Sequence, residues 1–423
     1  MERKISDELL KWKVDSYRKP MLLYGISGCG KTYSALSFGN EEYKNTIYFD
    51  CNNNLELSYV FDKNTTVDKL VRGLSAISLE TIFKGESLII FDNVNEKILK
   101  SVLALFATGD YHIIMITNDF SFVSFCKGKS VVLKKMTLVT FFEYLKFIGK
   151  EQMIAFIEDS FKTDKPMPFH SLAMEIYNDY VICGGYPVAI CSYNENDSYN
   201  FLSSIHERNV ILLKNKLFLL DNLIDIKRSS DIFNNVAIQL LKGNRKFVYG
   251  MIKSGARSKE YSRCLDFMEN NNMVIRSVRL NEIVSPISKG KDQDNFKLYY
   301  NDSGILYKKM NVSGNRLLTN EKLMGILYEN SIVTSLSNNG FNIYHYHSLG
   351  KAFLDLVIQT RTGKIIPIEI VSSSISSKSK SLALTMKKYN LSFAIRFTSD
   401  NFKMKNGIKY VPYYASCCVN EGM

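Results

Sequence analysis

The sequence predicts a multidomain α/β protein whose N-terminal part is built on a parallel sheet. Two observations carry this prediction. Short apolar runs that fit buried strands alternate with helix-compatible runs over residues 1 to about 135, which is typical of a right-handed parallel sheet. The chain also has 423 residues, more than one core usually organises at roughly 100 to 200 residues per domain.

The composition indicates an ordinary globular protein, with 46% hydrophobic and 23% charged residues. The N-terminal stretch MERKISDELLKWK is charged from its second residue and lacks the apolar core of a secretory signal. The longest apolar stretches are far shorter than the ~18 residues that span a bilayer. We therefore expect a cytoplasmic protein without a membrane partner. The eight cysteines lack the spacing of a zinc site and are expected to be reduced thiols.

The net charge of +12 and a pI near 9.1 favour contact with a polyanion. DNA is therefore one candidate macromolecular partner and another protein is the second. Charge alone governs solubility and steering, so it does not choose between them.

A glycine-rich loop, GISGCGKT, joins a short apolar strand at Met21–Tyr24 to a helix-compatible run at Tyr33–Phe38. Glycines let the backbone turn tightly and aim successive amide N–H groups inward, and the helix adds the positive end of its dipole. A phosphate fits such a loop, with Lys31 neutralising the β and γ phosphates and the Thr32 hydroxyl binding magnesium. The sequence thus predicts a site for ATP and Mg²⁺. Its loop residues are Gly25, Ile26, Ser27, Gly28, Cys29, Gly30, Lys31 and Thr32.

A second magnesium ligand is expected at the end of a neighbouring strand, where Ser87–Asp92 (SLIIFD) closes on Asp92. The next residue is Asn93, whereas many related ATPases have a glutamate that orients the attacking water. An amide can hold water but is a poor proton acceptor. Glu96 is the nearest carboxylate downstream and is either a substitute or a solvated helix residue. We predict that Lys31, Asp92 and Asn93 serve catalysis, with turnover that is slow or depends on a partner.

A third strand, His112–Asn118 (HIIMITN), ends in polar residues. Thr117 or Asn118 either senses the γ-phosphate or caps the strand, and we include Asn118 among the nucleotide-binding residues. The sequence assigns no arginine finger and leaves the oligomeric state open.

These ordered motifs resemble those of prokaryotic AAA-type ATP-binding proteins (P-loop NTPases) that carry a C-terminal restriction-endonuclease-like domain. The resemblance extends over nearly the whole chain. Met136–Leu145 is similar to the family's proline-leucine-serine-phenylalanine stretch, although its proline and serine are missing. Cys183–Pro187 (CGGYP) resembles the double-glycine motif after the ATPase lid, and Phe296–Leu306 resembles a family strand followed by a turn at Asp302–Gly304.

Lys246–Met273 resembles the winged-helix region of that family. Tyr261, Leu265 and Met268 recur at helical spacing, so we expect them to pack inward. The opposite face is basic and is expected to be solvated, where it either meets DNA phosphates or is ordinary surface. The basic residues are Arg257, Lys259 and Arg263.

The resemblance also implies a PD-(D/E)xK-like domain, in which a helix and two strands bring carboxylates together around magnesium. The matching residues here are Glu329, Asp355 and Glu369. The lysine expected two positions after the last acid is replaced by Val371, and Phe353 stands where the family commonly has another acid. A valine can neither donate a hydrogen bond nor carry charge.

Lys378 or Lys380, in the serine-rich segment Ser372–Ser381, is the remaining candidate for the missing lysine. We interpret this part of the chain as a nuclease-like fold that has lost its cleavage chemistry and acts as a binding module.

The predicted domains are a P-loop ATPase domain at 1–135, a helical lid and connector at 136–240, a winged-helix-like domain at 241–310 and a restriction-endonuclease-like domain at 311–423. Within the lid, a core face is expected from Phe141, Phe142, Leu145 and Phe147.

Three functions remain open. The first is an ATP-dependent switch that repositions basic C-terminal domains on DNA or a protein. The second is an ATP-regulated, magnesium-dependent DNA nuclease, which Val371 opposes. The third is a non-catalytic interaction protein that ATP stabilises as a structural ligand.

Overall fold

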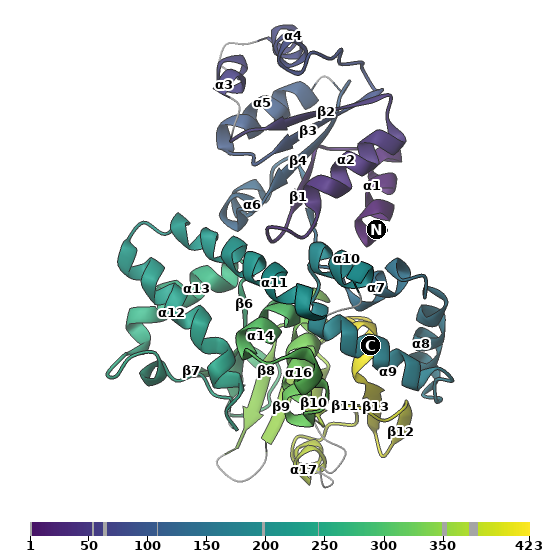
Figure 1. The fold of residues 1–423 in the computed structure, drawn as a ribbon, viewed down its shortest axis with the longest axis vertical. Helices are drawn as coiled ribbons and strands as arrows, with labels where there is room; N and C mark the ends of the chain where they lie inside the picture. Colours follow the sequence, from purple (N-terminus) through teal and green to yellow (C-terminus); the bar gives the residue numbers. More distant parts are fainter. Residues whose placement is uncertain are drawn as a thin grey trace. The chain divides into compact units, whose positions relative to one another are not determined.

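The computed structural model describes residues 2–52, 55–61, 66–107, 109–196, 199–243, 245–348, 353–371 and 380–423. The chain divides into two compact units, residues 1–138 and 139–423, which we describe separately (Figure 1). None of the described helices is long and apolar enough to cross a bilayer.

The first unit is built on a five-stranded sheet in which every pairing is parallel. The strands are β1 (Met21–Tyr24), β2 (Asn45–Asp50), β3 (Ser87–Asp92), β4 (His112–Thr117) and β5 (Val132–Lys135). Their order in the sheet is β2-β3-β4-β1-β5, which confirms the predicted parallel α/β fold. One expectation is wrong in detail: the strand that ends in Asp92 is not adjacent to β1, because β4 lies between them.

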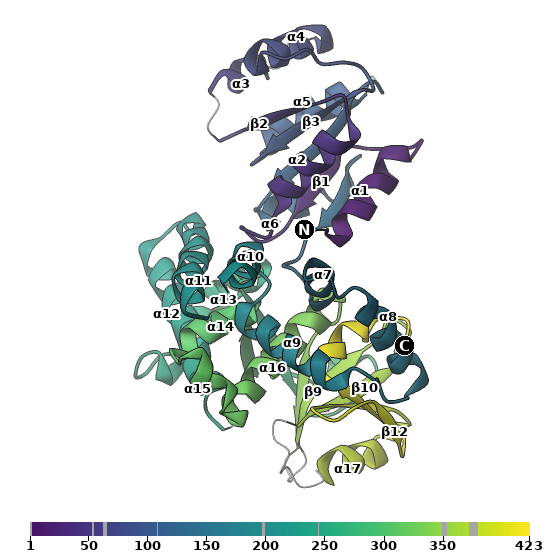
Figure 2. The ribbon, with the colours of Figure 1, turned by 45° about the vertical axis from the view of Figure 1, so that its right-hand side comes forward.

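Helices cover both faces of this sheet (Figure 2). The helices are α1 (Lys4–Val14), α2 (Lys31–Glu42), α3 (Leu55–Val60), α4 (Val67–Ser78), α5 (Glu96–Phe106) and α6 (Phe120–Cys126). Apolar residues of α3 to α6 pack with alternate residues of the strands in one core, while α2 packs on β2, β3 and β4 and contacts α1. Strands β3 and β4 are buried along their whole length, which is why they read as continuous apolar runs.

The second unit begins with helices and ends with a mixed sheet (Figure 1). The longer helices are α7 (Phe141–Phe147), α8 (Gln152–Thr163), α9 (His170–Cys183), α10 (Pro187–Asn196), α11 (Tyr199–Lys214), α12 (Leu223–Leu240), α13 (Ser258–Asn270), α14 (Ser303–Met310), α16 (Glu321–Asn338) and α17 (Lys380–Lys388), with a short α15 (Gly314–Leu318). Helix α13 buries Tyr261, Leu265 and Met268, which confirms the predicted inward face.

The sheet of the second unit has eight strands in the order β12-β13-β11-β10-β9-β8-β6-β7. The strands are β6 (Val274–Leu280), β7 (Lys291–Tyr300), β8 (Tyr344–His347), β9 (Phe353–Gln359), β10 (Ile365–Ile370), β11 (Ala394–Thr398), β12 (Lys403–Lys405) and β13 (Ile408–Pro412). The hairpin β6–β7 is antiparallel, and β6 also pairs in parallel with β8. The hairpin that follows α13 is therefore the edge of the same sheet that carries β9 and β10.

Two local predictions differ from the structure. Helix α7 buries Phe141, Tyr144 and Leu145, whereas Phe142 and Phe147 are only partly buried. The segment expected to turn at Asp302–Gly304 instead starts α14, because the Asp302 carboxylate accepts from the backbone N–H of Ile305 at 2.9 Å and caps the helix.

The capping aspartate also holds the double-glycine segment. Asp302 Oδ2 accepts from the backbone N–H of Gly185 at 2.7 Å, and a Cβ atom on Gly184 would lie 2.6 Å from the same carboxylate. Burial raises the pKa of Asp302 to about 6, although backbone hydrogen bonds from Gly185, Ile305 and Gly304 oppose the shift. The double-glycine segment and the start of α14 are therefore held together by buried hydrogen bonds to Asp302.

Candidate nucleotide site and candidate C-terminal sites

The glycine-rich loop connects β1 to α2 at the carboxyl edge of the first sheet. Gly28 and Gly30 have φ angles of 81° and 99°, in the left-handed region that favours glycine. At Gly25 the restriction is steric instead, because a Cβ atom would lie 2.2 Å from the carbonyl oxygen of Met136. The sequence pattern is thus explained by backbone conformation at two positions and by close packing at a third.

Lys31 is the first residue of α2, and its side chain folds back over the loop. Its Nζ donates to the carbonyl oxygens of Gly25 at 3.0 Å and Ile26 at 2.9 Å, and to Asn118 Oδ1 at 2.6 Å. Burial lowers the pKa of Lys31, and the nearby Cys29 and Asp92 oppose this shift. All three oxygen partners are neutral, so phosphate oxygens would be stronger partners for the same ammonium.

The Thr32 hydroxyl donates to Asp92 Oδ2 at 2.6 Å. The start of α2, which follows β1, therefore contacts the end of β3, although β4 lies between β1 and β3 in the sheet. Adjacent oxygen ligands of an octahedral Mg²⁺ lie about 3 Å apart, given metal–oxygen distances near 2.1 Å. This hydroxyl and carboxylate therefore fit a shared magnesium ion. Tyr48 on β2 also donates to Asp92 Oδ2, at 3.2 Å.

Asn93 follows Asp92 in a left-handed conformation, with a φ of 57°. Its backbone N–H donates to Asp92 Oδ1 at 2.8 Å, and its side-chain Nδ2 donates to Asp50 Oδ1 at 2.9 Å. Asp50 ends β2 directly opposite Asp92 in the parallel register. Glu96, the other carboxylate considered, is exposed at the first position of α5.

Asp50 and Asp92 make this edge of the sheet electronegative. Burial raises the pKa of the Cys51 thiol to about 12, and both carboxylates add to that shift. Asp50 was not predicted from the sequence, although a signal exists: Asn45–Asp50 (NTIYFD) ends in the same Phe-Asp pair as Ser87–Asp92 (SLIIFD).

The two polar residues at the end of β4, Thr117 and Asn118, make different contacts. Asn118 contacts the Lys31 ammonium, as described above, whereas the Thr117 hydroxyl accepts from the backbone N–H of Asp119 at 3.0 Å. The structure thus brings Asn118 to the loop and gives Thr117 the role of a strand cap.

Arg3 is a further residue of this site that sequence patterns do not reveal. Its guanidinium is buried and donates to the carbonyl oxygens of Cys29 at 3.0 Å and Thr137 at 2.8 Å. The loop is therefore fastened both to the N-terminal helix and to the segment after β5. Neither Arg3 nor its surroundings forms a motif that would mark it.

The three acids that the resemblance assigns to a nuclease-like site lie on a helix and two strands: Glu329 on α16, Asp355 on β9 and Glu369 on β10. Each has a protein partner. Glu329 forms an ion pair with Arg245 and accepts from Tyr299, Asp355 accepts from the backbone N–H of Ile370 at 2.8 Å, and Glu369 pairs with Arg396 at 2.6 Å.

No cluster of three or more metal-binding side chains occurs within the described ranges. Val371 follows the strand that carries Glu369, while Lys378 and residues 372–379 lie outside the described part of the chain. Within the described residues, each of the three acids thus has a protein partner of its own.

Lys297 on β7 is 1% exposed, with its Nζ 3.6 Å from Glu329 Oε1 and 5.0 Å from the centre of the Phe353 ring. Burial lowers the pKa of Lys297 to about 8; Asp355 opposes the shift and Arg245 adds to it. This lysine is an unusual feature of the core that sequence reasoning missed.

The Lys297 shift predicts a pH dependence of stability. The unfolded chain keeps this proton up to a pH near 10.5, whereas the folded chain releases it near 8, so unfolding takes up a proton between these values. Stability should rise by roughly 3 kcal/mol across that window relative to Lys297→Met, which cannot titrate. Urea unfolding of both proteins at pH 7.5 and 10 measures the difference, and parallel pH profiles would contradict it.

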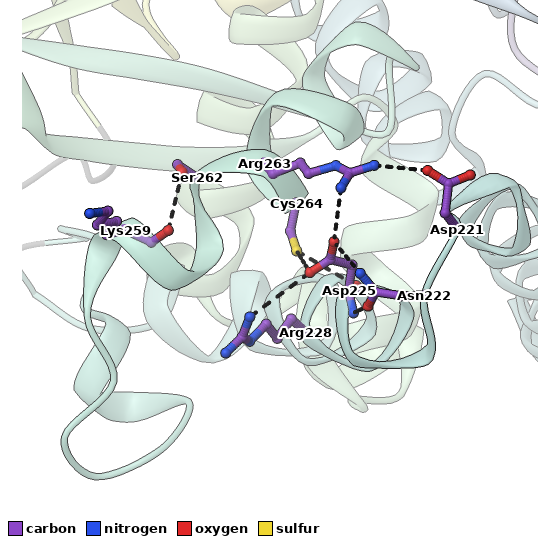
Figure 3. A network of polar contacts seen from close by, with 8 residues as sticks. All are labelled: Asp221, Asn222, Asp225, Arg228, Lys259, Ser262, Arg263 and Cys264. Carbon is purple, nitrogen blue, oxygen red and sulfur yellow. Dashed lines mark hydrogen bonds and ion pairs between the residues drawn. The ribbon is translucent and has the colours of Figure 1, made fainter.

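The basic face expected on α13 is partly neutralised by acids at the start of α12 (Figure 3). Arg263 contacts Asp221 at 3.0 Å and Asp225 at 3.8 Å, and Arg228 contacts Asp225 at 3.9 Å. Arg263 remains 63% exposed, so these are surface ion pairs of small energy that a stronger anion can displace. Arg257 and Lys259 are exposed.

A sequence-family model described as a domain of unknown function (DUF8612) matches residues 174–316. No curated protein matches the chain.

Three solved structures resemble this chain at low similarity. The Walker-type ATPase PABY2304 of Pyrococcus abyssi has a TM-score of 0.42 and 14% identity, over 73% of this chain and 95% of that one. The Aeropyrum pernix ORC1 protein in complex with DNA has a TM-score of 0.29 and 13% identity, over 74% and 92%. Drosophila ORC bound to DNA has a TM-score of 0.27 and 14% identity, over 73% and 94%.

Proposed function

We propose that the first unit binds ATP with Mg²⁺ in the loop Gly25–Thr32 and acts as an AAA-type nucleotide-dependent switch. The observation that carries this proposal is the convergence of three groups on one loop: the Lys31 ammonium, the Thr32 hydroxyl and the Asp92 carboxylate. Backbone N–H groups of a glycine-rich turn and the start of α2 supply further donors for phosphate.

Each residue has a distinct part in this proposal. Lys31 exchanges its loop carbonyl partners for oxygens of the β and γ phosphates. Thr32 and Asp92 hold the magnesium ion, which neutralises charge on the phosphates when bound. Asn118 keeps its contact with Lys31 and reports whether a γ-phosphate is present. Loss of that phosphate would return Lys31 to the loop oxygens, which supplies two states for a switch.

Magnesium dependence tests the assignment of Thr32. For the natural protein, calorimetry should give a lower Kd for ATP with Mg²⁺ than with EDTA. The ratio of these two Kd values should fall about tenfold or more in Thr32→Val, because valine keeps the shape of threonine but lacks the oxygen ligand. Thr46→Val, on β2 and outside the site, is the matched control. Equal magnesium effects in the natural and Thr32→Val proteins would contradict the assignment.

We expect hydrolysis to be slow or dependent on a partner, since Asn93 replaces the usual glutamate. Phosphate release at saturating ATP and Mg²⁺ measures this directly. A purely structural role for ATP is the alternative: binding would then raise the melting temperature by mass action without any turnover.

For the second unit, we propose a winged-helix-like region followed by a nuclease-like fold that binds rather than cleaves. The succession α16, β8, β9, β10, α17 and β11 supports the fold, because it supplies a helix and adjacent strands for three acids. The pairing of Glu329 with Arg245 and of Glu369 with Arg396 argues against a metal-dependent nuclease, since both carboxylates already have cationic partners.

DNA contact through α13 gives a measurable expectation. Short duplex DNA should bind with an affinity that falls steeply between 50 and 200 mM salt. The double variant Arg257→Ala/Lys259→Ala should weaken binding more than the control Lys403→Ala/Lys405→Ala on β12.

The same preparation should not nick plasmid DNA with Mg²⁺. Nicking that Glu369→Ala abolishes would support the nuclease, and absence of DNA binding at low salt would favour a protein partner.

A further inference from the structure

The end of β2 lies beside the residue that replaces the expected catalytic glutamate. Asp50 is opposite Asp92 in the parallel register, so the carboxyl ends of β2 and β3 lie next to each other. Across this edge the Asn93 Nδ2 group donates to Asp50 Oδ1 at 2.9 Å. Asp50 Oδ1 also accepts from the backbone N–H of Asn52 at 3.1 Å, which fixes the carboxylate at the strand end.

The contact determines which way the Asn93 amide faces. The hydrogen bond runs from Asn93 Nδ2 to the carboxylate, so the amide turns its NH₂ group toward Asp50. Its carbonyl oxygen, Oδ1, is then directed away from Asp50. An asparagine without this neighbour could flip the two ends of its amide at little cost.

The backbone at this position also suits asparagine. A φ of 57° lies in the left-handed region, where asparagine is several-fold enriched and a longer side chain such as glutamate is less favourable. The Asn93 backbone N–H is tied to Asp92 Oδ1 at 2.8 Å, which holds the residue against the magnesium-binding carboxylate. Both ends of Asn93 are therefore fixed by aspartates.

We propose that Asp50 is a positioning residue for ATP hydrolysis: it holds the Asn93 amide so that Oδ1 accepts a hydrogen bond from the attacking water. This inference rests on the proposed ATP binding. The pair would replace the single missing glutamate, with the carboxylate on β2 and the water-holding group after β3.

The chemical step needs no proton acceptor from the protein. The water oxygen forms a bond to the γ-phosphorus, the bond from that phosphorus to the ADP oxygen breaks, and the water proton passes to an oxygen of the transferred phosphoryl group. ADP and inorganic phosphate result, and neither Asn93 nor Asp50 changes its protonation state. A loose transition state requires an oriented water more than a strong base, so an amide can serve.

Other carboxylates nearby are less suited to this role. Asp92 already accepts from Thr32 and Tyr48. Glu96 is exposed on α5 and starts the helix that leads away from the strand end. Asp50 is the acid that directly contacts the Asn93 side chain.

Four variants test the proposal with two readouts, the Kd for ATP from calorimetry and kcat from steady-state phosphate release at saturating ATP and Mg²⁺. Asp50→Ala should lower kcat by about 10- to 100-fold while Kd stays within about twofold, because only the placement of the water is lost. Asp50→Asn should retain most of kcat, since its amide oxygen can accept from Asn93 Nδ2 in place of the carboxylate. Asn93→Ala should be as slow as Asp50→Ala, and the double variant no slower than Asn93→Ala.

Glu96→Gln is the matched control and should hydrolyse ATP at the natural rate. Four results would overturn the inference: natural turnover no faster than buffer, an unchanged kcat in Asp50→Ala, a double variant whose defects multiply, or a defect in Glu96→Gln equal to that of Asp50→Ala. Should Asp50→Ala not fold, Asp50→Leu takes its place: leucine is similar in size and has no acceptor, so this variant should be as slow as Asn93→Ala, and a natural rate would overturn the inference. Loss of ATP binding in the natural protein would instead refute the proposed function itself.

Discussion

Lys31→Ala is expected to weaken ATP binding by about 100-fold or more, the largest effect of any single substitution in the first unit. The Lys31 ammonium is held by three neutral oxygens and would gain charged phosphate oxygens in their place. Hydrogen bonds to charged groups contribute about 1.5 to 3 kcal/mol each, and 1.4 kcal/mol corresponds to tenfold in affinity. Titration calorimetry with ATP and Mg²⁺ measures the loss.

A matched lysine separates the local effect from the loss of one positive charge. Lys69 is exposed on α4, and Lys69→Ala removes the same charge from the same unit without touching the loop. Its affinity for ATP should equal that of the natural protein. If Lys31→Ala retained natural affinity while remaining folded, the loop would not be the nucleotide site and the proposed function would fail.

Arg245→Met is expected to lower the free energy of unfolding of the second unit by about 3 kcal/mol or more. Arg245 pairs with Glu329, a carboxylate that is 2% exposed in the interior. Removing the guanidinium leaves that carboxylate with Tyr299 and with Lys297 at 3.6 Å. Breaking one side of a buried ion pair is costly, because the remaining carboxylate stays desolvated and keeps only the more distant Lys297 ammonium as a cationic neighbour.

Methionine is the appropriate replacement because it keeps an unbranched side chain at a position whose φ is 48°. Urea unfolding measures the change, with Arg361→Met, at an exposed site, as the control. The double variant Arg245→Met/Glu329→Gln should recover part of the loss, since the charge left behind is then neutral. An undiminished stability in Arg245→Met would mean that Glu329 is not dependent on this partner.

The strand, glycine-rich loop and helix of the candidate nucleotide site were predictable because they are adjacent in the chain. A strand, a glycine-rich turn and a helix start are adjacent in the chain, so Gly25, Lys31 and Thr32 could be assigned without any knowledge of the tertiary fold. Asp92 required one further step, the rule that carboxyl ends of parallel strands share an edge. The same rule would have identified Asp50, whose strand is less apolar and therefore less conspicuous.

Contacts between distant segments could not be predicted in the same way. Arg3 reaches the loop from the position before α1, where no motif marks it, and Arg245 meets Glu329 across 84 positions of the chain (329 − 245). The helical face of α13 was predictable from its period, but the acids that pair with Arg263 come from another segment: Asp221 precedes α12 and Asp225 lies on it. Periodicity identifies which side of a helix is buried and leaves unknown which neighbours its surface charges will have.

The parallel pairing of β6 with β8 bears on how this protein can be divided for study. A cut after residue 310 would leave the β6–β7 ribbon with an open row of backbone donors and acceptors, the kind of edge from which aggregation starts. A fragment that contains all of residues 139–423 keeps the pairing of β6 with β8.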